Sequence, residues 1–276
     1  MRSRTRMKTE RSNSGKWLLA GTVLFASLFF VKLAGPKVNG TEFKDELHQV
    51  YPLATNGRIS FNNANGTVRI TAWDRPEVRL DAVRRAKNKE KFELVRIEIE
   101  SGSDFLKINT RYPERKWWGF KKIDLQTAVD YTLTVPQSAR LENIIGVNGE
   151  MEITDVRGEV HASTVNGALN ATGLSSDAGL SSVNGRIKAS FINLDGVKSI
   201  WMNTVNGAID LDLPEDANAD VSAKTMNGRI NGDVDFKRHW PLGESASTTL
   251  GTGGAKVSAN TMNGNVHISL VKRPHI

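Results

Sequence analysis

One three-residue motif recurs six times in the second half of the chain, and it limits what the chain can fold into. The first copy is Val147-Asn148-Gly149, and later copies have Val or Met in the first place. Asn and Gly are typical of tight turns because both tolerate positive backbone φ angles. One turn repeated with the same apolar neighbours predicts a repeat architecture. The predicted structural turns are Asn148-Gly149, Asn166-Gly167, Asn184-Gly185, Asn206-Gly207, Asn227-Gly228 and Asn263-Gly264.

The residues after each motif glycine alternate in polarity. The second, fourth and sixth are mostly apolar, as in Ile209, Leu211 and Leu213, whereas the third and fifth are polar or small. Alternation with period two predicts strands with one buried face. The motif returns after about 20 residues, too regularly for unrelated hairpins, so equivalent strands are expected to stack side by side. The sequence therefore predicts an all-β, parallel β-solenoid (β-helix) with about 18–22 residues per coil.

The residues before each turn leave two alternatives open. Ala162 and its equivalents look buried, and so does Val165 with its equivalents three positions later. Strict alternation cannot place both inside. Either a bulge or corner intervenes, or the Val/Met column lies on an outer face.

The N-terminus predicts a membrane segment. Residues 1–16 are basic and polar, and an apolar run begins at Trp17. A basic flank before such a run is typical of a signal anchor or signal peptide. We therefore expect a cytoplasmic tail over 1–16, a hydrophobic helix over 17–34 that contacts the membrane, a linker or cap over 35–55, and the solenoid over 56–276.

Composition narrows the function classes. Segment 1–35 holds seven of the 37 basic residues and one of the 30 acidic residues, so the body of the chain is nearly neutral. The high pI describes the N-terminus, and a nucleic-acid partner is not predicted. Cysteine is absent, which excludes disulfides, thiolate metal sites and a cysteine nucleophile.

Two insertions interrupt the repeat, at 111–122 and 236–254. The first combines cations with aromatic residues, a mixture suited to a membrane interface, an anionic polymer or a glycan. The alternative is a hairpin tip whose aromatic residues cover an open flank of the solenoid. The candidate surface-binding residues are Arg111, Arg115, Lys116, Trp117, Trp118, Phe120, Lys121 and Lys122.

No arrangement of residues predicts catalysis. Enzymatic β-helices need clustered carboxylates on one outer face, and the best pairs here are Asp210 with Asp212 and Asp233 with Asp235. Solvated strand faces explain these pairs equally well. The five histidines lack ligand spacing, and the Gly-rich run 251–254 lacks the lysine of a phosphate loop. We expect no catalytic residue, no cofactor and no metal site.

Three stretches give the chain a family resemblance: Asn65-Gly66-Thr67-Val68 running to Trp73-Asp74, the strand Tyr131 to Pro136, and the Thr-Val-Asn-Gly repeats. Over about 50–276 the chain resembles a bacterial putative-adhesin family of unknown function. The resemblance implies a right-handed β-solenoid on the cell envelope, with no catalytic residues to carry over.

These observations predict a non-enzymatic module for adhesion, scaffolding or envelope sensing. It would be anchored in the bacterial envelope with its C-terminal domain outside the cytoplasm, or secreted if the N-terminal signal is cleaved. An envelope glycan, an anionic lipid or another envelope protein are the expected partners. The alternative is a polysaccharide-binding or polysaccharide-active β-helix enzyme, which would need Asp210, Asp212, Asp233 and a basic residue in one groove.

Overall fold

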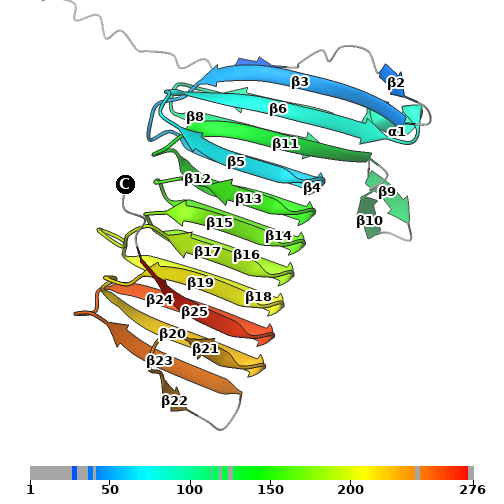
Figure 1. Cartoon of the computed structure of the whole chain (residues 1–276). Coiled ribbons are helices and arrows are strands. Elements are labelled where there is room, and N and C mark those ends of the chain that lie inside the picture. The colour runs from blue at the N-terminus through cyan, green and yellow to red at the C-terminus, as the bar shows by residue number, and fades with distance from the viewer. Residues whose placement is uncertain are drawn as a thin grey trace, which may run out of the picture.

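The fold is two facing β-sheets built mostly from stacked coils (Figure 1). The structure is a computed structural model, and it describes residues 27–29, 37–39, 42–112, 114–117, 120–123, 127–239 and 243–272. One sheet, here sheet A, has 12 strands; the other, sheet B, has 11; and a separate hairpin has two. This confirms an all-β fold with parallel sheets. The right-handed sense implied by the resemblance stays a prediction.

Each coil gives one strand to sheet A and the next strand to sheet B, and equivalent strands of successive coils pair in parallel. The coils are β4 (Arg58–Asn65) with β5 (Val68–Trp73), β12 (Arg140–Asn148) with β13 (Met151–Thr154), β14 (Val160–Asn166) with β15 (Leu169–Leu174), β16 (Ala178–Asn184) with β17 (Ile187–Phe191), β18 (Ser199–Asn206) with β19 (Ile209–Pro214), β20 (Ala219–Asn227) with β21 (Ile230–Gly232), and β24 (Ala255–Asn263) with β25 (Val266–Val271).

The N-terminal end of the stack departs from the plain coil. In sheet B, β3 pairs antiparallel with β6, and β6 pairs antiparallel with β11, which lies parallel to β5. In sheet A, β7 and β8 form an antiparallel pair beside β4. The remaining bounds are β1 (Ser27–Phe29), β2 (Lys37–Asn39), β3 (Glu42–Pro52), β6 (Glu77–Ala86), α1 (Lys89–Leu94), β7 (Arg96–Ser101), β8 (Phe105–Arg111), β9 (Glu114–Trp117), β10 (Phe120–Ile123), β11 (Thr127–Pro136), β22 (Lys237–His239) and β23 (Glu244–Leu250).

The predicted N-terminal helix over 17–34 lies outside the described residues, except at β1. There Ser27–Phe29 form a strand antiparallel to β7, in place of the expected helix. No helix in the described part of the chain is both long and apolar enough to span a membrane. The segment expected to be a linker or cap contains β3, an 11-residue strand, because it finds an open edge at β6.

The C-terminal coil does not lie at the end of the stack. Sheet A runs β18-β24-β20-β23-β22, and sheet B runs β19-β25-β21. The coil β24–β25 is therefore inserted between the two coils that precede it in sequence. The stacking order of the coils therefore differs from their sequence order at this point. Antiparallel β23 occupies the outer side of β20, so the last coil finds its backbone partners in the gap between β18 and β20.

The predicted core columns are confirmed where the strands are regular. The second residue after each motif glycine is fully buried, and so is the fourth except at Gly232. The buried second residues are Met151, Leu169, Ile187, Ile209, Ile230 and Val266. At the sixth position the column fails at Asp155, which is exposed and has a φ of 59°.

The Val/Met column lies on the outer face, which decides between the two alternatives left open by the sequence. Ala162 and its equivalents are buried, as are Thr164 and its equivalents two positions later, so alternation places Val165 outside. The exposed fractions of Val165, Val183, Val205, Met262 and Met226 run from 36% to 61%. The buried hydroxyls of Thr204, Thr225 and Thr261 donate to the carbonyl of a motif glycine in the neighbouring coil, as Thr261 does to Gly207 at 2.9 Å.

The asparagines of the motif form a side-chain ladder along one edge of the stack. Asn166 donates to Asn148, Asn184 to Asn166, and Asn206 to Asn184, each at 2.9 Å. Asn263 then donates to Asn206, and Asn227 to Asn263, at 2.8 Å. Amide ladders of this kind follow from stacking identical residues one strand spacing apart.

A glycine is required after each ladder asparagine because a Cβ would not fit there, and not because the backbone φ angle is positive. Among the motif glycines only Gly149 has a positive φ. A Cβ on any of the six would lie closer than 3.0 Å to the carbonyl oxygen of the equivalent glycine in the adjacent coil. Close approach of two backbones is the second reason for a glycine requirement. The expected reason, tolerance of positive φ, is therefore wrong for five of the six turns.

Candidate functional site

The predicted surface-binding loop forms the two-stranded hairpin β9–β10, which projects from the side of the stack (Figure 1). The register pairs Lys121 with Lys116, and Lys122 with Arg115, directly across the two strands. Phe120 pairs with Trp117 at the turn end, and Trp118 lies outside the described residues. The binding role of this loop stays a prediction.

Arg111, the first residue of the predicted loop, belongs to β8. Its Nε donates to Glu98 on β7 at 2.9 Å, and this hydrogen bond holds the pKa of the Glu98 carboxyl below its usual range. β7 and β8 are neighbouring antiparallel strands, so this contact joins two strands of sheet A. In this position Arg111 contributes to sheet A.

The predicted carboxylate pairs do not converge. Asp210 and Asp212 lie on the outer face of β19 in sheet B, and Asp210 pairs with Arg186 at 3.0 Å. Asp233 follows β21, on the far side of β25, where its carboxylate accepts the Leu270 N–H at 3.3 Å. Two strand spacings, about 10 Å, separate positions on β19 and β21. The groove that a polysaccharide-active enzyme would need is not formed by these residues.

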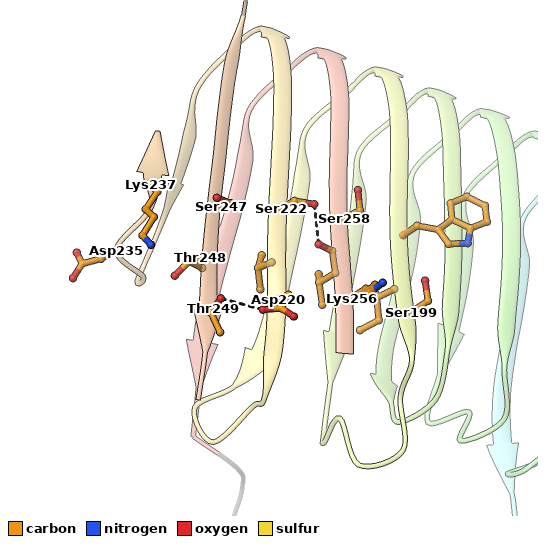
Figure 2. Close-up of a pocket in the computed structure, with 14 residues that line it drawn as sticks. Ser199, Asp220, Ser222, Asp235, Lys237, Ser247, Thr248, Thr249, Lys256 and Ser258 are labelled. Carbon is orange, nitrogen blue, oxygen red and sulfur yellow. Dashed lines mark hydrogen bonds between the residues drawn. The ribbon is translucent and has the colours of Figure 1, made fainter. Parts of the chain in front are cut away.

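A groove of about 740 Å³ lies instead on the outer face of sheet A, near its C-terminal end (Figure 2). Its floor is formed by β18, β24, β20 and β23, and Asp235 and Lys237 from the β22 segment stand at one side. The insertion 236–254 therefore contributes to this groove. The lining residues that carry hydroxyl groups are Ser199, Ser222, Ser247, Thr248, Thr249 and Ser258.

The hydroxyl-rich floor follows from strand register. Trp201 on β18, Ser258 on β24, Ser222 on β20 and Ser247 on β23 occupy one row across four neighbouring strands. Serine is short, so this row leaves space above the sheet. Ser222 donates to the Val257 carbonyl at 3.2 Å, so its hydroxyl is already partly engaged. The floor thus presents closely spaced donors and acceptors on a rigid backbone.

Trp201 forms the end of this row. Its indole ring covers Gly179 on β16, where a Cβ would clash with the ring and with His161 beyond it. The ring centroids of Trp201 and His161 lie 6.0 Å apart. Gly179 therefore makes room for a half-buried tryptophan that lies against the sheet beside the serine row. An aromatic ring next to hydroxyl groups offers both an apolar surface and hydrogen bonds to one ligand.

The residues that line the groove carry equal numbers of positive and negative charges. Lys256 lies next to Asp220 on the adjacent strand, and Asp220 accepts a hydrogen bond from the Thr249 hydroxyl at 3.0 Å. Asp235 and Lys237 add one charge of each sign. A phosphate polymer needs an excess of cations, so this groove is suited to a neutral polar ligand.

No group of three or more His, Asp or Glu in the described part of the chain could hold a metal ion.

Sequence reasoning missed most of this site. Asp235 was noted only as one of a carboxylate pair, and Trp201 and Ser222 lie in ordinary coil positions that carry no motif. The one available signal was the departure from the repeat: Trp201 stands where the equivalent positions hold His161, Gly179 and three serines.

Comparisons with known proteins bear on the second half of the chain. Residues 143–269 match the model of the family described as Toastrack DUF4097. No curated protein matches the chain.

Three solved structures show distant likeness. A putative cell adhesion protein from Clostridium sporogenes is 12% identical, with a TM-score of 0.45 over 82% of this chain and 100% of its own. A putative adhesin from Bacteroides fragilis is 11% identical, with a TM-score of 0.36 over 82% and 97%. A putative lipid binding protein from Parabacteroides distasonis is 12% identical, with a TM-score of 0.30 over the same shares.

Residues 143–269, somewhat less than half of the chain, are therefore the part that is similar to the Toastrack DUF4097 family.

Proposed function

We propose that this chain is a non-enzymatic adhesion-type module of the cell envelope that binds a neutral polysaccharide in the sheet A groove. The observation that carries the proposal is the row formed by Trp201, Ser258, Ser222 and Ser247, in which an aromatic ring adjoins a floor of hydroxyl groups. A sugar ring has an apolar face and a rim of hydroxyl groups, so it matches both parts of this row.

The form of the site supports binding rather than turnover. Asp220 lies beside Lys256 and accepts from Thr249, which engages its carboxylate in the sheet surface. Asp210 and Asp212 are on the opposite sheet. Glycoside hydrolysis uses two carboxyl groups that flank one bond, and the predicted carboxylate pairs do not provide that arrangement.

The stack gives the groove a rigid support. The strands of its floor are fixed by parallel and antiparallel ladders on both sides. A preorganised surface loses little conformational entropy when it binds, which favours recognition of a repetitive polymer. The adhesin-like family and the signal-like N-terminus agree with display on the envelope.

Affinity electrophoresis against dextran, xylan, chitin oligosaccharides and alginate tests the proposal. Ser222→Arg fills the groove floor without removing Trp201, and Lys256→Ala removes a groove charge. Lys188→Ala on the outer face of sheet B is the matched control. We expect retention by at least one neutral polymer, lost in Ser222→Arg, weakened in Lys256→Ala and unchanged in Lys188→Ala.

Two results would reject the proposal. One is equal retention of Ser222→Arg and the unaltered protein. The other is release of reducing ends from a bound polymer at enzyme-like rates, because that would make the site catalytic.

A further inference from the structure

The chain contains ten Asn-Gly pairs, and this dipeptide is prone to a specific reaction. The backbone nitrogen of the glycine can attack the side-chain amide carbon of the asparagine, because glycine has no Cβ to hinder the approach. Six of these pairs form the amide ladder, and the other four are Asn39-Gly40, Asn56-Gly57, Asn65-Gly66 and Asn231-Gly232. Each pair reacts only if the glycine nitrogen is free and the amide can rotate toward it.

At the interior Asn-Gly pairs of the amide ladder, hydrogen bonds hold both the glycine nitrogen and the asparagine amide in place. At Asn184-Gly185 the glycine N–H donates to the Asn206 carbonyl at 3.0 Å. The Asn184 side chain donates to Asn166 and accepts from Asn206, each at 2.9 Å. The attacking nitrogen and the amide under attack are therefore both engaged in the sheet. The same backbone bond from the motif glycine occurs at Gly149, Gly167, Gly207 and Gly264.

The last rung lacks this protection. Asn227 lies on β20, and beyond it no further coil stacks on the ladder. Of the six ladder glycines, all of them described, Gly228 is the one whose N–H has no hydrogen-bond partner. The amide of Asn227 donates to Asn263 but its oxygen accepts no hydrogen bond among the described residues. Gly228 is also exposed, whereas the other five motif glycines are half-buried.

The end of β20 pairs with β24 on its inner side as far as Asn227, but its outer side has little support. The covering strand β23 pairs with β20 only as far as Thr225, opposite Glu244. The strand that follows, β21, is three residues long and pairs with β25 alone. Terminal segments with few backbone partners open at low free energy, so Asn227 reaches a reactive conformation without unfolding of the stack.

We propose that Asn227-Gly228 is a built-in site of spontaneous deamidation, and that the fold protects the other rungs of the ladder. The Gly228 nitrogen forms a bond to the Asn227 Cγ and loses its proton to solvent. The bond from Cγ to Nδ2 breaks and ammonia leaves. Water then opens the succinimide ring, giving aspartate or isoaspartate at 227.

The product weakens the end of the stack that carries the groove. A carboxylate at 227 cannot donate to the Asn263 oxygen and instead faces it with a negative charge. Isoaspartate also lengthens the backbone where β20 ends. Because β20 supplies Asp220 and Ser222 to the groove floor, the modification loosens one wall of that site.

Peptide mapping by mass spectrometry tests the proposal. The purified chain is aged at mildly alkaline pH at 37 °C, and the amide-to-acid mass gain and isoaspartyl content are followed at each Asn-Gly pair. We expect Asn227 to convert at least about tenfold faster than Asn184, because the interior rung reacts only after the sheet opens. In denaturant the two sites should convert at similar rates.

Two variants serve as controls. Asn227→Gln keeps an amide but disfavours ring closure, so it should remove the early product, whereas Asn184→Gln should leave it unchanged. Conversion of any interior rung as fast as Asn227 would overturn the proposal. So would conversion first at Asn56, or no conversion at Asn227 when the denatured chain reacts.

Discussion

The side chains of Asn206 and Asn263 are hydrogen-bonded at 2.8 Å although 57 residues separate them in sequence. The intervening Asn227 lies on the far side of Asn263 and bonds to it at 2.8 Å. The ladder order is therefore 206, 263, 227, and it records the insertion of the C-terminal coil between its two predecessors. The sheet A groove depends on this order, because its floor places β24, which follows the insertion 236–254, between β18 and β20, which precede it.

Engineered disulfides test the coil order directly, because the chain has no cysteine of its own. Thr204 pairs with Thr261 and Asn206 with Asn263, so Val205 and Met262 face each other on adjacent strands. The Cα separation in such a pair, about 5 Å, permits a disulfide. We expect Val205→Cys with Met262→Cys to cross-link on oxidation, as shown by mass spectrometry without reductant.

The matched control joins Val205→Cys to Met226→Cys, which sequential stacking would make neighbours. With β24 between them these positions are about 10 Å apart, too far for the bond. Cross-linking of the control pair and not of the first pair would contradict the inserted order.

Removing one asparagine side chain from the amide ladder should measure how much the ladder contributes to the free energy of unfolding. Asn206→Ala deletes a donor to Asn184 and an acceptor for Asn263. We expect a loss of about 1–2 kcal/mol in the free energy of unfolding, because each exposed hydrogen bond contributes about 1 kcal/mol or less net. The midpoint of urea unfolding measures it. Asn231→Ala, an exposed strand position outside the ladder, should be nearly neutral, and equal effects in the two variants would refute a structural role for the ladder.

Adding one methyl group at a ladder glycine should be costly. In Gly185→Ala the new Cβ would meet the carbonyl of Gly167, and neither backbone can move without disturbing both sheets. We expect a loss above about 3 kcal/mol, in the range of severe steric mutations. Gly196→Ala is the control, since its Cβ meets nothing within 4 Å and only its φ of 76° is unfavourable. That penalty is about 1–2 kcal/mol, so the reverse ranking in thermal unfolding would be inconsistent with close approach as the cause.

The three tyrosines should resist ionisation together. Burial raises the pKa of Tyr51, Tyr112 and Tyr131 above the ordinary value, and Tyr131 packs its hydroxyl against Thr110 at 2.6 Å inside the core. A raised pKa means that the folded state binds the proton more tightly. The stabilisation is therefore complete below pH about 10 and is lost as pH rises beyond it.

Absorbance titration of tyrosinate provides the check. The folded chain should show no tyrosine ionising near pH 10, and ionisation should coincide with loss of the β-sheet circular dichroism signal. In urea all three should titrate near the ordinary value. A tyrosine that ionises near pH 10 while the sheet signal is intact would contradict its burial.

The β9–β10 hairpin should bind anionic surfaces if its predicted role holds. Its register pairs Lys116 with Lys121 and Arg115 with Lys122, so four basic residues lie in one short hairpin. Basic residues beside aromatic residues suit an anionic lipid surface. We expect replacement of Trp117 and Trp118 by Ala to weaken binding to phosphatidylserine vesicles in a sedimentation assay.

Two measurements decide between that role and a structural one. The melting temperature should stay unchanged in the double Trp variant, and Lys87→Ala, on the exposed segment before α1, should bind as well as the unaltered protein. Unchanged vesicle binding with a lowered melting temperature would instead show that the aromatic residues cover the flank of the solenoid.

The burial pattern could be predicted because it is local. Ile209 and Leu211 alternate with polar neighbours, and a strand with one buried face needs nothing else to place them inside. The recurrence of Asn-Gly likewise predicted stacked coils. The position of Val205 could not be decided, since two neighbouring columns were apolar and only the sheet shows which one faces the core.

The candidate groove could not be predicted because it joins distant segments. Trp201 and Ser258 are 57 residues apart, and they share a row only because β24 pairs with β18. β23 covers the outer edge of β20, and that long-range contact directs β24 into the interior gap.

The sequence by itself determined the repeating unit: an Asn-Gly turn, a strand with alternating burial, and the nearly neutral body of the chain. These properties depend on residues that are close in sequence. Backbone geometry and solvation favour one local conformation for such residues. Only the tertiary structure decided the order of the coils, the close backbone approach that requires each ladder glycine, and the groove. Those properties depend on which strand edges meet, and that is set by pairing between residues far apart in the chain.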